Sequence, residues 1–112
     1  MKYDIKIDKY KTTRYYVDNV LHREDGPAVE FSHGEKNWYK NGKRHREDGP
    51  AVEHSNGTKY WYKNGEFHRE DGPAIEFFTG LKKWYLNNVY YGVNEDFTNK
   101  SWKRFIKTLI FS

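Results

Sequence analysis

The stretch HREDGPA, residues 22–28, occurs unchanged twice more in this chain, at residues 45–51 and 68–74. Successive copies therefore begin 23 residues apart. A repeat of this length is typical of a stacked array in which each unit buries its surfaces against the neighbouring units. The sequence predicts a repeat protein whose units span residues 22–90.

Further residues follow the same period. A Trp-Tyr pair occurs at residues 38–39, 61–62 and 84–85, and Tyr15-Tyr16 falls in the same register one period earlier. We predict that the repeated residues build the architecture of the array. They are His22, Arg23, Asp25, Gly26, Pro27, Trp38, His45, Arg46, Asp48, Gly49, Pro50, Trp61, His68, Arg69, Asp71, Gly72, Pro73 and Trp84.

Each unit contains two short β-prone segments separated by glycine turns. In one unit, residues 50–55 and 58–63 flank Asn56-Gly57, and Asn64-Gly65 ends the second segment. Asn-Gly between β-prone segments is a strong hairpin signal, because both central residues of a type I′ turn need a positive φ. The fold class predicted is mainly β, an antiparallel meander of β-hairpin repeats.

The turn lengths predict which residues face each other. Two-residue turns at both ends would place Val52 opposite Trp61, and Trp61 opposite His68. The predicted core row is then the pairs Val29/Trp38, Val52/Trp61 and Ile75/Trp84. A change of one residue in register would exchange the two faces of the sheet. The Asp-Gly-Pro steps that link the units are predicted to be tight turns.

The two ends of the chain differ from the array. Residues 1–21 are predicted to form a capping strand and a half-repeat, with Tyr3, Ile5 and Ile7 on the half-buried side of a strand at residues 2–8. Residues 91–112 are predicted to form an amphipathic helix that begins at Asn94 and covers the open end of the array. Its apolar side comprises Trp102, Phe105, Ile106, Leu109 and Ile110. The whole chain, residues 1–112, is interpreted as one domain.

Composition limits the classes of function. Cysteine is absent, which excludes disulfides and thiolate metal sites. No apolar run is long enough for a membrane span and no signal-peptide pattern is present, so we expect a cytoplasmic protein with no membrane partner. The net charge is +4, but residues 22–90 carry eleven Lys and Arg against eleven Asp and Glu, so the excess is at the two ends.

The His-Arg-Glu-Asp clusters raise the question of chemistry. Such side chains suit metal ligation or acid-base catalysis, yet an active site is needed once and this cluster occurs three times at the repeat period. We therefore interpret the clusters as architecture, in which each arginine pairs with nearby carboxylates. No catalytic residue, metal site or cofactor is predicted, and the protein is expected not to be an enzyme.

A binding function should use positions that differ between units. Tyr60, Phe67 and Tyr90 occupy such positions and are predicted to anchor a protein partner. The alternative is a nucleic-acid binder that uses a basic row and the basic side of the helix. Those residues are Lys36, Lys59, Lys82, Lys100, Lys103, Arg104 and Lys107. The sequence leaves the oligomeric state open.

Over residues 15–90 the pattern Trp-Tyr-x-Asn-Gly followed by HREDGPA resembles the MORN-variant repeats of small proteins from phages and bacterial mobile elements. The resemblance implies a β-hairpin array used for binding, a viral origin and action in the host cytoplasm. It suggests as partner a host protein or nucleoprotein complex, such as a defence protein that the chain inhibits. Tyr15, Asn19, Asn88 and Tyr91 depart from the pattern at the ends of the array.

Overall fold

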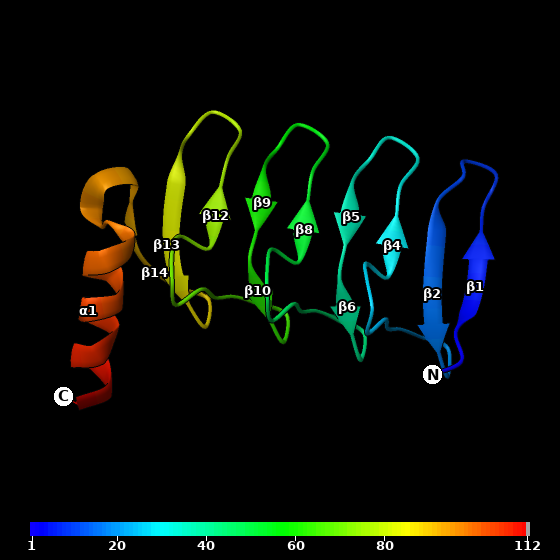
Figure 1. The fold of residues 1–112 in the computed structure, drawn as a ribbon, viewed down its shortest axis with the longest axis horizontal. Coiled ribbons are helices and arrows are strands. Elements are labelled where there is room, and N and C mark those ends of the chain that lie inside the picture. Colours follow the sequence, from blue (N-terminus) through cyan, green and yellow to red (C-terminus); the bar gives the residue numbers. More distant parts are fainter. Residues whose placement is uncertain (112) are drawn as a thin grey trace.

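The computed structural model describes residues 1–111 as an elongated, mainly β molecule with extents of 47 × 31 × 18 Å. Hairpins stand side by side along the long axis, and a helix closes the C-terminal end (Figure 1). The strands at the two ends are β1 (Asp4–Ile7), β2 (Thr13–Val17), β3 (Val20–Leu21), β13 (Lys82–Leu86) and β14 (Val89–Val93). The repeats contribute β4 (Val29–Glu30), β5 (Lys36–Asn37), β6 (Tyr39–Lys40), β7 (Lys43–Arg44), β8 (Val52–Glu53), β9 (Lys59–Tyr60), β10 (Tyr62–Lys63), β11 (Glu66–Phe67) and β12 (Ile75–Glu76).

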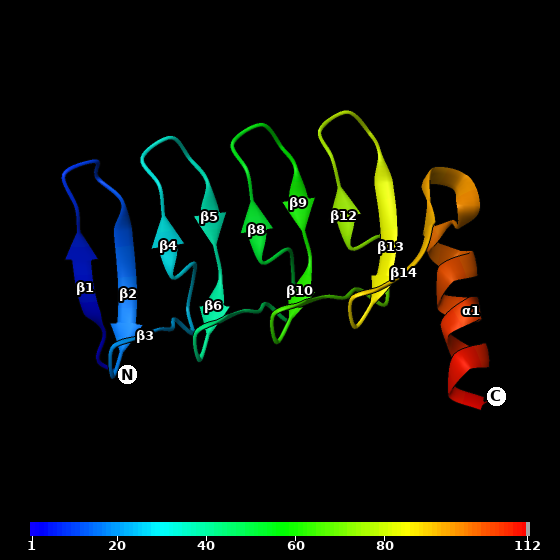
Figure 2. The same ribbon diagram turned by 180° about the vertical axis from the view of Figure 1, so that it is seen from behind.

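One antiparallel sheet runs the length of the molecule, in the order β1-β2-β4-β5-β8-β9-β12-β13-β14. Strand β3 pairs with β2, while β6 with β7 and β10 with β11 form two-stranded ribbons below the main sheet. Figure 2 shows the segments that connect successive units running along this lower edge. The predicted meander of hairpin repeats is confirmed.

The turns at the lower edge have two residues, as predicted. Lys63 pairs with Glu66 across Asn64-Gly65, whose φ values are 50° and 82°. At the ends of the array Asp18-Asn19 and Asn87-Asn88 replace Asn-Gly, yet both residues of each pair keep a positive φ. Asparagine and aspartate tolerate this left-handed region better than most residues. The irregular ends of the repeat pattern therefore retain its turn.

The turns at the upper edge are one residue longer than predicted. The His54 N–H donates to Thr58 O and the Gly57 N–H donates to His54 O, so three residues form the loop. Only Gly57 takes a positive φ there, at 95°. This is the three-residue hairpin loop in which a type I turn is followed by a left-handed glycine. The Asn-Gly signal indicated the hairpin correctly and its loop length wrongly.

The extra loop residue changes the register and corrects the predicted core row. Val52 lies opposite Tyr60, not Trp61, while the Trp61 N–H donates to Ala74 O. Val29, Val52 and Ile75 therefore lie on the side of the sheet that also carries Tyr60 and, by alternation along the strands, Tyr39, Tyr62 and Tyr85. We call this side the tyrosine face. Trp38, Trp61 and Trp84 share the other side with the fully buried Ala28, Ala51 and Ala74, which we call the tryptophan face.

The linkers between units also differ from the prediction. Asp25-Gly26-Pro27 forms an open bend rather than a hydrogen-bonded tight turn, and Gly26 has no positive φ. Glycine is required for a different reason. A Cβ at Gly26, Gly49 or Gly72 would lie 3.0, 2.8 or 2.7 Å from the guanidinium carbon of the arginine three residues earlier. The glycine thus makes room for an arginine.

The C-terminal helix α1 (Asn99–Phe111) begins five residues later than predicted. The acids after Asn94 instead form the 3₁₀ turn η1 (Asn94–Asp96), and Thr98 caps α1 by accepting from the Ser101 N–H at 3.0 Å. Trp102 is fully buried, Ile106 nearly so, and Leu109 is 40% exposed. The side chain of Ile110 lies outside the described residues. No helix in residues 1–111 is both long and apolar enough to cross a bilayer.

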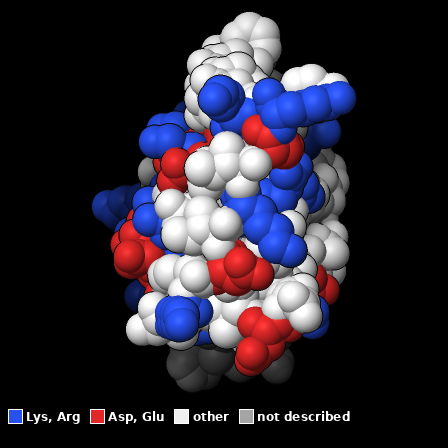
Figure 3. Space-filling model, turned by 90° about the vertical axis from the view of Figure 1, so that its right-hand side faces the viewer, with Lys and Arg blue, Asp and Glu red and all other residues white. Residues whose placement is uncertain are grey.

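The N-terminal end of the sheet is uncovered. Strand β1 forms where the alternation predicted it, but Ile5 and Ile7 are 51% and 65% exposed, so the predicted half-burial of these two side chains is wrong. The reason is that β1 is an edge strand with no unit packed beyond it. Viewed from this end, Lys and Arg are interspersed with Asp and Glu (Figure 3). Mixed charges of this kind discourage pairing of edge strands between molecules.

Candidate functional site

The tyrosine face gathers the positions that vary between units. Because residues alternate along a strand, positions 31, 35 and 37 of one unit project to the same side as Val29, and their equivalents in later units do likewise. The predicted anchors Tyr60, Phe67 and Tyr90 lie on this face. Residues that repeat without change are concentrated on the opposite face. The sequence period thus separates the two surfaces.

The three predicted anchors belong to one cluster of aromatic rings. The centroids of Tyr60 and Phe67 are 5.8 Å apart, in an edge-to-face arrangement. Tyr85 connects Phe67 to Tyr90, because its ring centroid lies 5.2 Å from that of Phe67 and 5.5 Å from that of Tyr90. Tyr62 stacks on Phe67 at 4.4 Å. Tyr90 is 50% exposed, whereas the other rings are half-buried, so the cluster is firmly packed yet reaches solvent.

Cations border the aromatic cluster. The Arg44 guanidinium lies 5.9 Å from the Tyr39 ring and 5.6 Å from the Tyr62 ring, and the Lys83 ammonium lies 5.9 Å from the Phe77 ring. Burial raises the pKa of Tyr62, and the charge of Arg44 offsets only part of this effect. The Tyr62 hydroxyl therefore remains protonated at neutral pH. Aromatic and arginine side chains together are the types enriched at the centres of protein interfaces.

A polar group occupies the N-terminal part of the same face. Glu35 accepts a hydrogen bond from Asn37 at 3.0 Å and pairs with His54 Nδ1 at 2.7 Å. Burial alone would raise the pKa of Glu35, but these two hydrogen bonds outweigh it and hold the pKa below its ordinary value of 4.5. The His54 ring in turn lies edge-on to Tyr60 at 5.1 Å. The polar group and the aromatic cluster are therefore contiguous.

The His-Arg-Glu-Asp clusters form a repeated framework on the tryptophan face. Each arginine guanidinium stacks on an aromatic ring, Arg23 on Tyr15 at 3.9 Å, Arg46 on Trp38 at 3.9 Å and Arg69 on Trp61 at 3.8 Å. Each also donates to an Asp, a Glu and a proline carbonyl. For Arg69 these bonds reach Asp71 at 2.9 Å, Glu76 at 2.9 Å and Pro73 O at 3.1 Å. The predicted arginine-carboxylate pairs are present in all three units.

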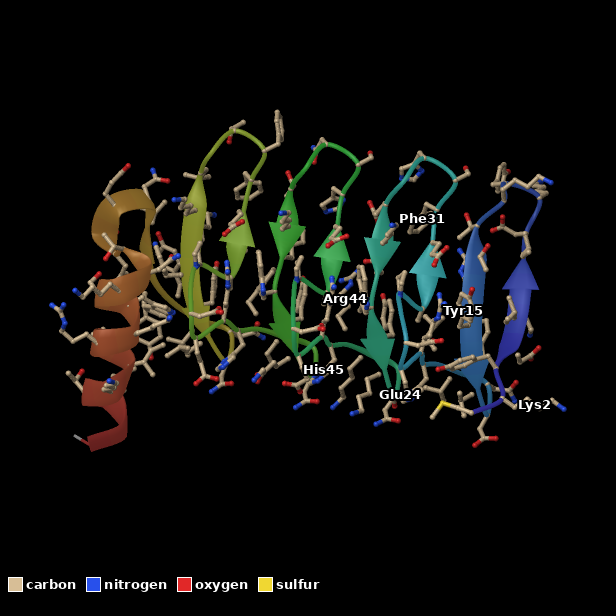
Figure 4. All side chains as sticks on the ribbon, viewed as in Figure 1. Lys2, Tyr15, Glu24, Phe31, Arg44 and His45 are labelled. Atoms are coloured by element: carbon tan, nitrogen blue, oxygen red, sulfur yellow. The ribbon has the colours of Figure 1, made fainter. Side chains whose placement is uncertain are left out.

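The histidines of the clusters tie each linker to the next hairpin. His45 Nδ1 accepts from the Asn64 N–H at 2.9 Å, and His45 Nε2 lies 2.7 Å from Glu47. His22 and His68 make the same two contacts. With both ring nitrogens engaged, these histidines are poorly placed as general bases. Figure 4 places Glu24 and His45 at the edge along which the linkers run. No group of three or more potential metal ligands is assembled within residues 1–111.

The predicted row of lysines is not a basic stripe. Lys36 lies opposite Glu30 and Glu53, and Lys59 lies opposite Glu53 and Glu76, so the two signs alternate along the sheet. By contrast, Lys100, Lys103, Arg104 and Lys107 line one shallow hollow on the exposed side of α1. The structure thus keeps the four cations of the helix together and separates the lysines of the array with acids.

Sequence reasoning missed part of the tyrosine face. Tyr62 and Tyr85 repeat at the period and were not among the predicted partner-binding residues, although their rings contact Phe67 directly. Two-residue periodicity along the strands would have assigned them to this face once the correct loop length was known. Comparison with family models, with curated proteins and with solved structures finds no match to this chain.

Proposed function

We propose that this protein is a non-enzymatic binding module whose tyrosine face contacts a protein partner. The observation that carries the proposal is the assembly of Tyr60, Phe67 and Tyr90 into one ring cluster. Tyr60 and Phe67 come from one unit and Tyr90 from the next, and the residue at each of these positions differs between units. A stable repeat scaffold that presents variable aromatic side chains on one face is a typical binding surface for a protein.

The packing of the rings favours a protein over single-stranded nucleic acid. Bases stack on the open faces of aromatic rings. Here Tyr62 and Phe67 stack on each other at 4.4 Å, and Tyr60 meets Phe67, Phe77 and His54 edge-on. Much of the ring surface is therefore already used within the chain. Tyr90 is the most exposed ring of the cluster, at 50%, and it suits a partner surface with an apolar centre.

The chemistry of the border suggests the character of the partner. Arg44 and Lys83 add positive charge beside the rings, so the partner should place carboxylates around its apolar centre. The resemblance to phage repeats makes a bacterial protein the first class to test, and a defence protein inhibited in the host cytoplasm is the specific hypothesis. That part of the proposal rests on the resemblance alone.

One observation favours a second candidate, nucleic-acid binding through α1. Lys100, Lys103, Arg104 and Lys107 share one hollow and point away from the array. The row of Lys36, Lys59 and Lys82 alternates with glutamates, so in this second candidate function only the helix would contact the nucleic acid. Binding would then weaken steeply with salt, since each neutralised phosphate releases counterions.

The test is capture from bacterial lysate by the tagged full-length chain, with and without nuclease, followed by mass spectrometry. Three baits are compared: wild type, Tyr90→Ser and Ile7→Ser. The two variants remove similarly exposed apolar side chains, from the tyrosine face and from edge strand β1 respectively. The affinity of the recovered protein for each purified bait is then measured by calorimetry.

We expect a protein that is recovered regardless of nuclease and that binds Tyr90→Ser at least about tenfold more weakly, as for an interface anchor. Ile7→Ser should bind as wild type does. Equal loss in both variants, or no loss in either, would contradict the assignment of the tyrosine face. Capture that disappears with nuclease would transfer the function to the basic helix.

A further inference from the structure

The tryptophan face contains a series of three equivalent grooves, each lying between successive linkers. The first has a volume of about 670 Å³ and is lined by Arg23, Trp38, Lys40 and Arg46, among others. The second, about 480 Å³, is lined by the residues one period later, including Trp61 and Lys63. Both volumes fall in the range of small-ligand sites. The third groove would be bounded by Arg69 and Trp84.

The chain itself occupies part of the third groove, and a hollow of about 330 Å³ beside Leu86 and Tyr91 remains. The Trp102 ring of α1 lies 5.4 Å from the Trp84 ring, and its indole N–H donates to Arg69 O at 2.8 Å. The equivalent residues are Trp38 with Arg23 in the first groove and Trp61 with Arg46 in the second, and all four line these grooves. The third groove therefore demonstrates how this framework receives an indole.

Two substitutions adapt the third groove to its internal occupant. Gly92 stands one period after Arg69, so no guanidinium covers the Trp84 ring, and Phe97 packs against that ring at 5.6 Å. Leu86 stands at the position of Lys40 and Lys63 in the other grooves, and it packs against the cluster of Trp84, Trp102 and Ile106. Helix α1 is thus matched to an apolar floor, whereas the first two grooves keep a tryptophan and a lysine.

The rim of the open grooves is acidic. Asp25, Glu47 and Asp48 have side chains 70%, 68% and 89% exposed. The arginines of the same grooves are only 18% and 22% exposed and are held in ion pairs within the sheet. Each groove also contains one lysine, Lys40 in the first and Lys63 in the second, against four carboxylates, so the charge that an incoming ligand meets is mainly negative. A ligand that carries a cation beside its aromatic ring would be complementary.

We infer that the first two grooves are binding sites for aromatic side chains, with tryptophan preferred, on a peptide segment that has basic residues next to the aromatic one. The ring lies against the part of Trp38 or Trp61 that its stacked arginine, Arg46 or Arg69, leaves exposed, in a contact like that of Trp102 with Trp84. An indole N–H donates to the carbonyl of Arg23 or Arg46, and basic neighbours face the acidic rim. This surface is on the opposite side of the sheet from the tyrosine face and is independent of it.

The test uses the ¹⁵N-labelled full-length chain and three capped tripeptides, Lys-Trp-Lys, Glu-Trp-Glu and Lys-Ala-Lys. The chain has four tryptophans, so the indole N–H signals of Trp38 and Trp61 report on the grooves, and those of Trp84 and Trp102 serve as internal references. We expect Lys-Trp-Lys to shift the first pair saturably and to leave the second pair unchanged. Glu-Trp-Glu should bind about two- to fivefold more weakly, and Lys-Ala-Lys should produce no saturable shift.

A double variant tests the rim. Asp25→Asn with Asp48→Asn retains an acceptor for each arginine but removes two negative charges, and Asp4→Asn with Glu95→Gln removes two charges from exposed sites outside both grooves. The rim variant should weaken Lys-Trp-Lys binding about two- to fivefold, while the matched control and Tyr90→Ser should not change it.

The inference is overturned if Trp38 and Trp61 show no saturable shift up to about 5 mM peptide, which is weaker than any useful recognition. Equal shifts of Trp84 and Trp102, or equal binding of Lys-Ala-Lys, would overturn it as well. Shifts that grow with protein concentration in the absence of peptide would identify a second copy of the chain as the occupant and would likewise contradict it. None of these results bears on the tyrosine face, which Tyr90→Ser tests separately.

Discussion

Replacing Arg46 by lysine should separate the architectural role of the repeated arginines from simple charge. Arg46 stacks on Trp38 at 3.9 Å and donates to Asp48, Pro50 O and Glu53 at 3.2, 3.1 and 3.3 Å. Its side chain is only 22% exposed. Lysine keeps the charge but loses the planar stacking surface and the fixed fork of donors. The change therefore removes geometry and leaves the net charge unaltered.

The expected loss follows from these contacts. A partly desolvated cation-π contact contributes about 0.5–2 kcal/mol, and a hydrogen bond from a charged donor about 1.5–3 kcal/mol. Lysine can keep one of the three acceptors, and the freed carboxylates Asp48 and Glu53, which are 89% and 35% exposed, can bind water instead. The loss is therefore smaller than the sum of these values, and Arg46→Lys should lower the free energy of unfolding by about 2–3 kcal/mol. Arg44→Lys is the matched control. Arg44 is exposed and lies 5.6 Å or more from its ring partners, so its replacement should cost under about 0.5 kcal/mol.

The assay is urea unfolding of both variants, followed by far-ultraviolet circular dichroism and by tryptophan fluorescence. Coincident transitions with unchanged slopes would allow the two midpoints to be compared as stabilities. Gly49→Ala should also move the Arg46 guanidinium out of its stacked position, because the new Cβ would lie 2.8 Å from the guanidinium carbon. If Arg46→Lys and Arg44→Lys differ by less than about 0.5 kcal/mol, the stacked arginine is not a structural element and the reasoning fails.

Two further predictions concern the helix and the polar group of the tyrosine face. Trp102→Ala should lower the free energy of unfolding by about 3–5 kcal/mol, because it removes the ring contact with Trp84 and the hydrogen bond to Arg69 O. Trp102→Phe should cost less, because it keeps an aromatic ring. Thermal unfolding of both variants checks which one is less stable. The pKa of Glu35 is lower in the folded chain than its ordinary value of 4.5, so its contribution to stability is present above about pH 4.5 and disappears as the pH falls through the folded value. Glu35→Gln should therefore lose less stability than wild type between pH 6 and pH 3 in urea titrations at fixed temperature; parallel profiles would contradict the assignment.

The sequence predicted the units well because their signals are local. Two-residue turns need residues that accept positive φ, and the pairs Asn64-Gly65 and Asn87-Asn88 supply them. Repetition at a fixed period also identified which side chains belong to the framework. Ion pairs such as Arg69 with Asp71 and Glu76 follow from placing those residues on adjacent segments.

The faces of the sheet were not predictable from the same signals. Asn56-Gly57 is compatible with a loop of two or three residues, and the difference exchanges Trp61 and Tyr60 between faces. The packing of side chains determines which loop length forms. A small, buried Ala51 beside Trp61 leaves space for the Trp61 ring and the arginine stacked on it, whereas the bulkier Val52 would not. Likewise, the start of α1 depends on Asn94, which takes φ of 51° and accepts from the Lys82 N–H, a contact between segments that no local pattern indicates.

The two faces of the sheet differ in role, which explains how a short repeat could present the binding surface that we propose. Stacking of the units depends on Trp61, Arg69 and Ala74, all of which lie on the tryptophan face or in the linkers. Positions such as Tyr60 and Phe67 lie on the other side, where they contact one another and not the arginine framework. Substitution there leaves the arginine framework in place and removes only ring contacts between units, such as Phe67 with Tyr85 and Tyr60 with Phe77. The fixed residues thus set the spacing of the array, and the variable ones supply the surface that we propose binds a partner.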